Sequence, residues 1–354
     1  TMKKVAFGVA VCGLWANFAH LPSILDCSDA ELVATCDVVE ERARSYAEKF
    51  GARRWYTSLP DMLKDADIDA VDVILPHKYH HDSVVAAAET GKHILCEKPM
   101  AMTLAECDGM IRAARKAGVK LMIAHNKRFD PHHELAKKTI EEGFLGKIVL
   151  GRGRYMGSQT YLQSFSHTDW RLKPELAGGG ALTDLGSHYV DLLRWLMPGE
   201  ARSVTAFQAL LTEMAIMPQL EDNAAMLMQF DSGAIAIVDA SWSVRVPYRW
   251  EEGTEIYGSE GKIMTRGIGS MQGPMHPIEI FTSRQVLGSS TGVILPEYTY
   301  DPLISTKREV AHFVNCILED KEPRIKGEDA RKTIECILAG YESAKTGKTI
   351  HLSQ

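Results

Sequence analysis

The first third of the chain alternates between two kinds of segment, and this alternation restricts the fold more than any other feature. Short apolar runs suited to strands, such as "VAFGVAV", "ELVATC", "AVDVIL" and "HILC", alternate with segments that have helical spacing. Continuous apolar runs are typical of strands that helices cover on both faces. The alternation over residues 4–125 therefore predicts an α/β fold with a doubly wound parallel sheet and right-handed crossovers.

The turn after the first strand suggests a ligand for this sheet. Residues 11–16 read "VCGLWA", where a dinucleotide-binding turn would read GxGxxG, so that Gly13 and the small Ala16 match and Val11 replaces the first glycine. Asp37 ends the second strand 24 residues after Gly13, close to the offset of about 20 residues at which a carboxylate accepts ribose hydroxyls and repels a 2′-phosphate. An exposed turn residue or a helix N-cap would explain Asp37 equally well by itself. Within a strand–turn–helix unit, Asp37 favours NAD over NADP.

The N-terminus permits a second interpretation. Lys3 and Lys4 precede "VAFGVAVCGLW" and "ANFA", an order of basic, apolar and small residues typical of a signal peptide. A first buried strand accounts better for the segments that follow.

The 7 cysteines form no CxxC pair, which favours a reducing compartment, and we expect a cytoplasmic protein without disulfides.

Length and charge narrow the class of protein. At 354 residues the chain exceeds the usual size of one hydrophobic core. We predict a dinucleotide-binding domain over residues 1–125 and a substrate-binding and oligomerisation α/β domain over residues 126–354.

The net charge is −6 without a basic block, so neither nucleic acid nor an anionic membrane surface is an expected partner. No apolar run is long enough to span a membrane.

Two polar clusters follow the third and fourth predicted strands. "PHKYHH" occupies residues 76–81, and "CEKP" ends at Pro99. Carboxyl ends of parallel strands share one rim, so both clusters should face the ligand crevice. The histidine spacing matches neither HExxH nor a Cys/His finger, and we predict no metal. We expect His80 beside the nicotinamide, and His77 and His81 in solvent.

Lys98 ends a strand that should be buried. A surface lysine paired with Glu97 is the ordinary alternative. Its place at the crevice instead favours a donor to a substrate hydroxyl or carbonyl oxygen, with desolvation and a neighbouring carboxylate controlling its charge. Pro99 would fix the turn that aims it.

The second half of the chain has a different pattern. A helix ends at Gly143, and strand-like segments with hairpin turns at 231–233 and 258–259 predict a large, mainly antiparallel sheet. The strands "AAMLMQF" and "AIAIVDASW" predict one sheet face too apolar to remain in water. We expect an irregular segment over residues 267–297 and two helices at the end of the chain.

One helix of this half carries a polar stripe. Asp184, His188 and Asp191 recur at i, i+4 and i+7. A solvated helix face is the ordinary alternative, but the stripe lacks Lys and Glu, and the nearby glycines permit close approach of backbone or ligand. His188 suits a general base at neutral pH, and Asp184 or Asp191 would orient it or hold a substrate hydroxyl. The opposite face should be buried through Leu182, Leu185, Tyr189, Leu192, Leu193 and Leu196.

Four separated motifs occur in an order that resembles the Gfo/Idh/MocA family of NAD(P)-dependent sugar and cyclitol oxidoreductases. They are "CEKP", Trp170-Arg171, "GGGALTDLGSHYVDLLRWL" and "ARKTIECILAGYESAKTGK". The resemblance spans nearly the whole chain. It implies a Rossmann domain, then an α/β domain whose open sheet forms the interface of a homodimer or homotetramer. It also implies hydride transfer between NAD and a ring hydroxyl of a sugar, glycoside or cyclitol.

The resemblance implies roles for individual residues as well. Lys98 would contact the reacting oxygen, Asp184 the substrate and His188 the proton, and Arg128 and Tyr155 would help to bind the substrate. Val11 and Leu14 stand where the family usually has glycines. The implied cofactor-binding residues are Gly13, Leu14, Trp15, Ala16, Asp37, Pro76, His77, His80, Glu97, Lys98, Asn126, Trp170 and Arg171.

Two other functions remain open within this resemblance. An enzyme that retains NAD would oxidise a glycoside transiently and eliminate a substituent. A cofactor-binding regulator without chemistry would lack the catalytic trio or displace it. The aromatic and acidic residues suit a polyhydroxylated ring without strong charge, and no arginine cluster indicates a phosphate or a nucleotide sugar.

Overall fold

The computed structural model describes residues 4–10, 13–158, 169–211, 220–246, 250–268, 278–283, 292–294 and 301–353. The chain forms two units, the first from residues 1–129 and 303–334 and the second from residues 130–302 and 335–354. The first change of unit lies close to the predicted boundary at 125/126. The return of residues 303–334 to the first unit was not predicted. Its cause is the apolar face of α10 (Ile304–Leu318), where the ring of Phe313 lies 6.4 Å from that of Phe7.

The first unit contains the predicted parallel sheet. The strand order is β3-β2-β1-β4-β5-β6, and every described pair is parallel. This is the order of dinucleotide-binding sheets, in which ligands bind beyond the carboxyl ends of the strands. All residues of β1 and β4 are buried, as their continuous apolar runs predict. The strands are β1 (Val5–Ala10), β2 (Ala30–Cys36), β3 (Arg54–Tyr56), β4 (Ala70–Val73), β5 (His93–Glu97) and β6 (Leu121–Ala124).

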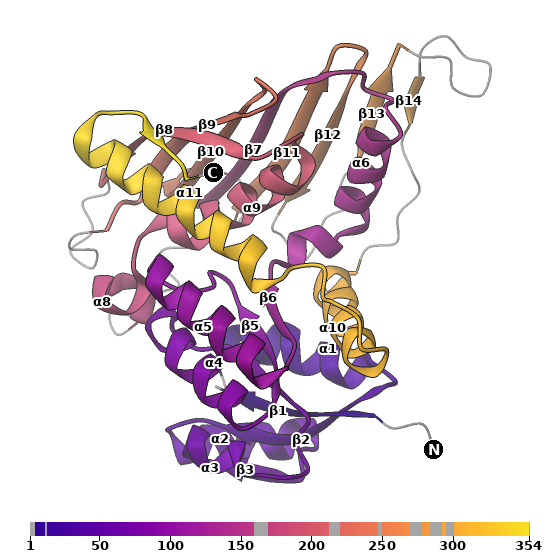
Figure 1. Ribbon diagram of the computed structural model, residues 1–354, viewed down its shortest axis with the longest axis vertical. Coiled ribbons are helices and arrows are strands. Elements are labelled where there is room, and N and C mark those ends of the chain that lie inside the picture. The colour runs from indigo at the N-terminus through magenta and orange to yellow at the C-terminus, as the bar shows by residue number, and fades with distance from the viewer. Residues whose placement is uncertain are drawn as a thin grey trace. The chain divides into compact units, whose positions relative to one another are not determined.

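Helices connect these strands on both faces of the sheet. Since β1–β3 and β4–β6 extend in opposite directions, right-handed crossovers place α1 and α2 on one face and α4 and α5 on the other. Figure 1 shows α4 and α5 side by side. A capping box of Thr103 and Glu106 begins α5. The elements are η1 (Ala16–His20, a π-helical turn), α1 (Leu21–Asp26), α2 (Glu40–Phe50), α3 (Leu59–Leu63), η2 (His77–Tyr79), α4 (His80–Glu89), α5 (Leu104–Ala117) and η3 (Asn126–Phe129).

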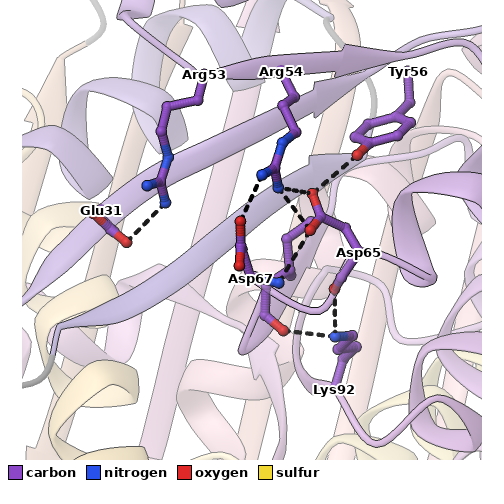
Figure 2. A network of polar contacts seen from close by, with 8 residues as sticks. Glu31, Arg53, Arg54, Tyr56, Asp65, Asp67 and Lys92 are labelled. Atoms are coloured by element: carbon purple, nitrogen blue, oxygen red, sulfur yellow. Dashed lines mark hydrogen bonds and ion pairs between the residues drawn. The ribbon is translucent and has the colours of Figure 1, made fainter.

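The edge strand β3 was not predicted from the sequence. Charged side chains fix it: Arg54 binds Asp65 at 2.6 and 2.7 Å and Asp67 at 2.6 Å, as Figure 2 shows. The Tyr56 hydroxyl donates to Asp65 at 2.9 Å, and the buried Lys92 ammonium donates to the Asp65 carbonyl at 2.8 Å. The strand has three residues and no apolar run, so hydrophobic periodicity does not indicate a strand there.

The second unit contains the predicted large sheet, in the order β14-β13-β12-β11-β7-β10-β9-β8-β15. Among the described pairs, only β7 and β10 run parallel. The irregular segment expected over residues 267–297 is wrong for β13 and β14, whose pairing extends the sheet, and its other residues lie mainly outside the described ranges. The strands are β7 (Ile148–Ser158), β8 (Ala201–Ala209), β9 (Asn223–Phe230), β10 (Ile235–Val244), β11 (Trp250–Gly258), β12 (Gly261–Ile268), β13 (Glu279–Thr282), β14 (Gly292–Ile294) and β15 (Ile350–His351).

Helices cover one face of this sheet. In Figure 1, α9 lies against β7, where Gly153 leaves room for Tyr189. The six apolar residues predicted to fill the buried face of this helical region are all buried. None of the helices in the described ranges is both long and apolar enough to cross a membrane. The helices are α6 (Pro131–Glu141), η4 (Trp170–Leu172), α8 (Pro174–Ala177), η5 (Leu182–Gly186), α9 (Ser187–Leu196) and α11 (Gly327–Thr346), of which α11 begins in the first unit.

The other face of the large sheet carries two kinds of side chain. Register places Phe207, Leu227 and Ile237 on this face, and Phe207 is 74% and Leu227 44% exposed. Arg152 and Arg154 on β7 share the face, and Arg154 binds Glu251 at 2.9 Å. The apolar side chains of this face therefore lie on β8–β10, and its charged side chains lie on β7, on β11 and, at Asp239, on β10.

Candidate active site

The turn after β1 leads directly into a helix. The carbonyl of Gly13 accepts the Asn17 N–H at 3.0 Å, so hydrogen bonding begins at the glycine. Ala16 is fully buried, whereas Leu14 is 73% exposed. Val11 lies outside the described residues. Gly13 and Ala16 thus occupy the positions expected of a cofactor-binding turn, and Leu14 projects away from the core.

Asp37 lies at the end of β2 with its carboxylate buried. Its Oδ1 accepts the Val39 N–H at 2.8 Å and lies 3.2 Å from the Arg42 guanidinium. The N-cap of α2 is Val39, so the two ordinary alternatives for Asp37, an exposed turn residue and an N-cap, are both wrong. A buried carboxylate at this strand end suits ribose recognition. Arg42, which sequence reasoning missed, adds a cation beside it.

The histidines after β4 are part of the protein interior. His80 is fully buried, with Nε2 at 2.8 Å from the Leu75 carbonyl and Nδ1 at 3.0 Å from the Pro99 carbonyl. Burial lowers the pKa of His80. His77 is also buried, with its ring 5.7 Å from that of His80, so the expectation of a solvated His77 is wrong. His80 joins the segments that follow β4 and β5, and Pro76 precedes the turn that carries His77.

A buried charged cluster adjoins Lys98. Nδ1 of His20 lies 2.8 Å from Asp72 Oδ2, and Nε2 lies 2.9 Å from Glu97 Oε1. The Trp15 indole donates to Glu97 Oε1 at 3.0 Å, and Glu97 Oε2 accepts the backbone N–H of Lys98 at 2.9 Å. Both Glu97 oxygens are thus engaged within the first unit, and a role for Glu97 in cofactor binding stays a prediction. The Lys98–Pro99 peptide bond is cis.

Burial and charge act in opposite directions on this cluster. Burial alone would lower the pKa of His20, but Asp72 and Glu97 outweigh it and raise that pKa well above its usual value. Burial raises the pKa of Asp72, whereas the hydrogen bond and charge of His20 outweigh burial at Glu97 and lower the pKa of that carboxyl. His20 was not a predicted site residue.

Two predicted residues follow β6. Asn126 Oδ1 is buried and has no hydrogen-bond partner among the described residues, so it is available to a ligand. Arg128 is buried, pairs with Asp329 at 2.5 Å, and its carbonyl accepts from Arg324 at 2.8 Å. A role for Arg128 in substrate binding stays a prediction, since its guanidinium already has a carboxylate partner.

In the second unit, Asp184 and His188 lie on consecutive helical segments. Asp184 is buried on the π-helical turn η5, and its Oδ2 accepts the Trp242 indole N–H at 3.0 Å. His188 is half-buried, with its ring 6.0 Å from that of Tyr155. Asp191 is completely buried. The π-helical turn alters the regular i, i+4 spacing that the sequence pattern assumes. Trp242, from β10, was missed.

The glycines before this helix admit protein backbone. A Cβ on Gly180 would lie 2.0 Å from the Glu221 carbonyl oxygen. The buried Glu221 carboxylate accepts the N–H groups of Gly180 and Leu182, both at 3.0 Å, and the Tyr341 hydroxyl at 2.7 Å. Glu221 therefore satisfies the first donors of the helix that carries Asp184 and His188.

Trp170 and Arg171 lie in the second unit on the short helix η4. The Arg171 guanidinium stacks on the Trp170 ring at 4.7 Å and lies 3.2 Å from Asp169. Lys98 belongs to the first unit, and Asp184 and His188 belong to the second. Among the described residues no group of three or more His, Cys, Asp or Glu could hold a metal ion.

The residues at the rim of the first sheet fit a dinucleotide. The strand order, the glycine turn, the buried Asp37 carboxylate and the unpartnered Asn126 oxygen agree with that ligand. Gly13 would approach the pyrophosphate and Asp37 the adenosine ribose.

Comparisons with known proteins agree with this fit. A family model described as an oxidoreductase family with an NAD-binding Rossmann fold matches residues 7–125, and one described as the GFO/IDH/MocA C-terminal domain matches residues 133–264. The 1,5-anhydro-D-fructose reductase of Ensifer adhaerens is 30% identical over 91% of this chain and 91% of its own. The myo-inositol 2-dehydrogenase of Thermotoga maritima is 28% identical over 92% of each chain. A crystal structure of aldose-aldose oxidoreductase from Caulobacter crescentus, complexed with glycerol, has a TM-score of 0.85 and 29% identity, and covers 99% of this chain and 100% of that one.

Proposed function

Because the chain belongs to the Gfo/Idh/MocA family of NAD-binding oxidoreductases, we propose that it transfers a hydride between NAD and a ring hydroxyl of a sugar, glycoside or cyclitol. The observation that carries the proposal is Asp184 held by the Trp242 indole, with His188 and the Tyr155 ring beside it. A carboxylate, an imidazole and aromatic rings suit a neutral polyhydroxylated ring. Relatives named for 1,5-anhydro-D-fructose and myo-inositol support this substrate class.

Each residue of the proposed trio has one task. The Lys98 ammonium donates a hydrogen bond to the substrate oxygen and stabilises the charge that develops there. His188 takes the hydroxyl proton as general base. Asp184 accepts a hydrogen bond from a neighbouring substrate hydroxyl, in the orientation that Trp242 fixes. When bound, NAD would supply the hydride acceptor: the hydroxyl proton goes to His188, the hydride leaves the carbon that carries the hydroxyl, and the alcohol, having lost one proton and one hydride, becomes a carbonyl.

The direct test is a screen of inositols, aldoses, anhydro sugars and glycosides for NADH formation. We expect one of these classes to give saturable NADH formation, and a phosphorylated analogue of the best substrate to react more slowly. Binding of NAD without NADH formation from any polyol would reject the proposed substrate class.

A retained cofactor is the second candidate, since one relative is named as an aldose-aldose oxidoreductase. Such a chain would carry nicotinamide through purification and convert substrate without added NAD. Release of bound NAD(H) on denaturation, together with turnover in its absence, would favour this alternative over a dehydrogenase that releases NADH.

We also propose that copies of the chain associate through the open face of the large sheet. Phe207 and Leu227 are exposed on that face, and the pairs of Arg154 with Glu251 and Arg152 with Glu255 give it charges of both signs. A surface of this composition suits a homodimer or homotetramer interface.

A further inference from the structure

His20 connects three elements of the first unit and has no place in the proposed chemistry. It is the last residue of η1, Asp72 lies on β4, and Glu97 ends β5. Its imidazole is fully buried, and each ring nitrogen lies within 2.9 Å of a carboxylate oxygen. Such distances at both nitrogens are those of two hydrogen bonds.

The two carboxylates decide the charge of the ring. A neutral imidazole has one N–H, so it could donate to only one of Asp72 and Glu97 and would turn a lone pair toward the other. The imidazolium donates to both. The pKa of His20 is raised in agreement with this arrangement. The buried cluster therefore contains one cation between two anions.

Glu97 connects His20 to the backbone of Lys98 through hydrogen bonds. Its Oε1 is held by His20 and by the Trp15 indole, and its Oε2 accepts the Lys98 N–H at 2.9 Å. A carboxylate fixed at both oxygens cannot rotate without breaking one of these bonds. The orientation of the Lys98 backbone thus depends on a histidine from the helix that follows the glycine turn.

We propose that His20 is a positioning residue: the Asp72–His20–Glu97 relay fixes the Glu97 carboxylate, and Glu97 fixes the backbone from which Lys98 reaches the reacting oxygen. The catalytic consequence rests on the proposed function of Lys98, while the relay itself does not. The relay operates while His20 is protonated. At high pH the ring loses one N–H, one carboxylate loses its donor, and the rate should fall.

Other groups near His20 define the electrostatic setting. The buried Cys96 thiol is next to Glu97, and its pKa is raised by burial and by the charges of Glu97 and Asp72. Helix α10, which packs against η1 and α1, contributes the buried Glu309, and Lys307 on α10 lies 3.4 Å from Asp26 on α1. Asp72 and Glu97 are the groups bonded to the imidazole.

Two variants and one control test the relay. His20→Gln keeps polar volume but cannot donate to both carboxylates. It should lower kcat about 10- to 100-fold, a scale typical of a misplaced catalytic group, with little change in the Kd for NAD. Ser23→Ala, at an equally buried residue one turn later whose hydroxyl has no partner among the described residues, should leave both unchanged. A His20→Gln variant with parental kcat and pH profile would overturn the proposal.

Asp72→Asn gives a second signature and covers the case in which His20→Gln does not fold. The substitution removes the negative charge of Asp72 beside His20, and the asparagine side-chain oxygen can still accept a hydrogen bond from Nδ1–H. We expect near-parental kcat at low pH and an alkaline fall in rate that begins at a lower pH than in the parent. An unchanged alkaline limb would contradict the relay, because a purely structural Asp72 would not set that pH.

Nuclear magnetic resonance separates the relay from the proposed function. In the parent, His20 should stay doubly protonated above about pH 6.5, the usual imidazole pKa, and the Lys98 amide resonance should shift in Asp72→Asn and in folded His20→Gln but not in Ser23→Ala. If no polyol is oxidised while these signals behave as expected, the proposed function fails and the relay stands. A His20 that titrates at the usual imidazole pKa of about 6.5 or an unmoved Lys98 amide would overturn the relay.

Discussion

The Trp242 indole N–H donates to the Asp184 carboxylate at 3.0 Å, and both side chains are buried. A strand of the large sheet thereby fixes the orientation of a carboxylate on a helix. An unpaired buried acceptor is costly, so the bond both stabilises the second unit and restricts where Asp184 can point.

Trp242→Phe should reveal both effects. The variant keeps an aromatic ring and removes the donor, so we expect a loss of about 1–3 kcal/mol in the free energy of unfolding. A rise in KM larger than the fall in kcat should accompany it. Tyr257→Phe removes a hydroxyl bonded to Glu255 on the other face of the same sheet, and steady-state kinetics should not change. Equal kinetics for the two variants would refute the role of Trp242.

Cofactor preference should depend on Asp37 and Arg42 together. We predict that NAD binds more tightly than NADP, because the Asp37 carboxylate repels a 2′-phosphate. Asp37→Ser removes that repulsion. It also frees Arg42, whose guanidinium lies 3.2 Å from the Asp37 carboxylate in the parent, to bind the phosphate. Adding Arg42→Ala should abolish the gain in NADP affinity. Calorimetric titration of the parent and both variants measures this, and equal affinities of the parent for NAD and NADP would contradict the role of Asp37.

The stability of the first unit should depend on pH through His20. Its pKa is raised on folding from an unfolded value of about 6.5. The stabilisation from its charge is therefore complete below about pH 6.5 and is lost as pH rises through the folded-state pKa. His20→Ala breaks a buried ion pair and should cost about 3–5 kcal/mol near pH 6. The difference from the parent should shrink at alkaline pH in denaturant titrations, and a difference that grows with pH would be inconsistent with a buried imidazolium.

Self-association should depend on the apolar part of the open sheet face. Leu227→Lys and Phe207→Lys place charges where a partner would bury apolar surface, and light scattering at micromolar concentration should show smaller species. Leu14→Lys, at an exposed leucine of the first unit, is the matched control and should not change the oligomeric state. A parent that is monomeric under these conditions would contradict the proposed interface.

The sequence predicted features that depend on local patterns. Apolar runs located β1, β4 and β5, and the end of β5 indicated Lys98. The edge strand β3 was not predicted, because ion pairs rather than an apolar run hold it in the sheet. Asp184 and His188 followed from helical spacing, although a π-helical turn carries the first of them.

Contacts between distant residues were beyond the reach of these patterns. His20 meets Asp72 and Glu97, which are 52 and 77 residues away, and Trp242 meets Asp184 across 58 residues. Helical spacing presents His20 simply as a residue of an apolar helix. Its importance depends on which strand ends the fold brings to it, and local periodicity contains no information about that pairing.

The central claim is that Lys98 polarises the reacting oxygen while His188 removes the proton. His188→Ala should lower turnover, because it removes the proposed general base. Combined with Lys98→Met, it should cost less than the sum of the two separate barriers, because both residues act on one proton-transfer event.

The most direct measurement is the turnover of Lys98→Met on the best substrate of the parent, with NAD affinity measured on the same preparation. Methionine keeps much of the side-chain volume and removes the donor. We predict nearly unchanged NAD affinity and a fall in kcat of about 10²-fold or more. Near-parental turnover by this variant would contradict the account and make Lys98 a structural residue.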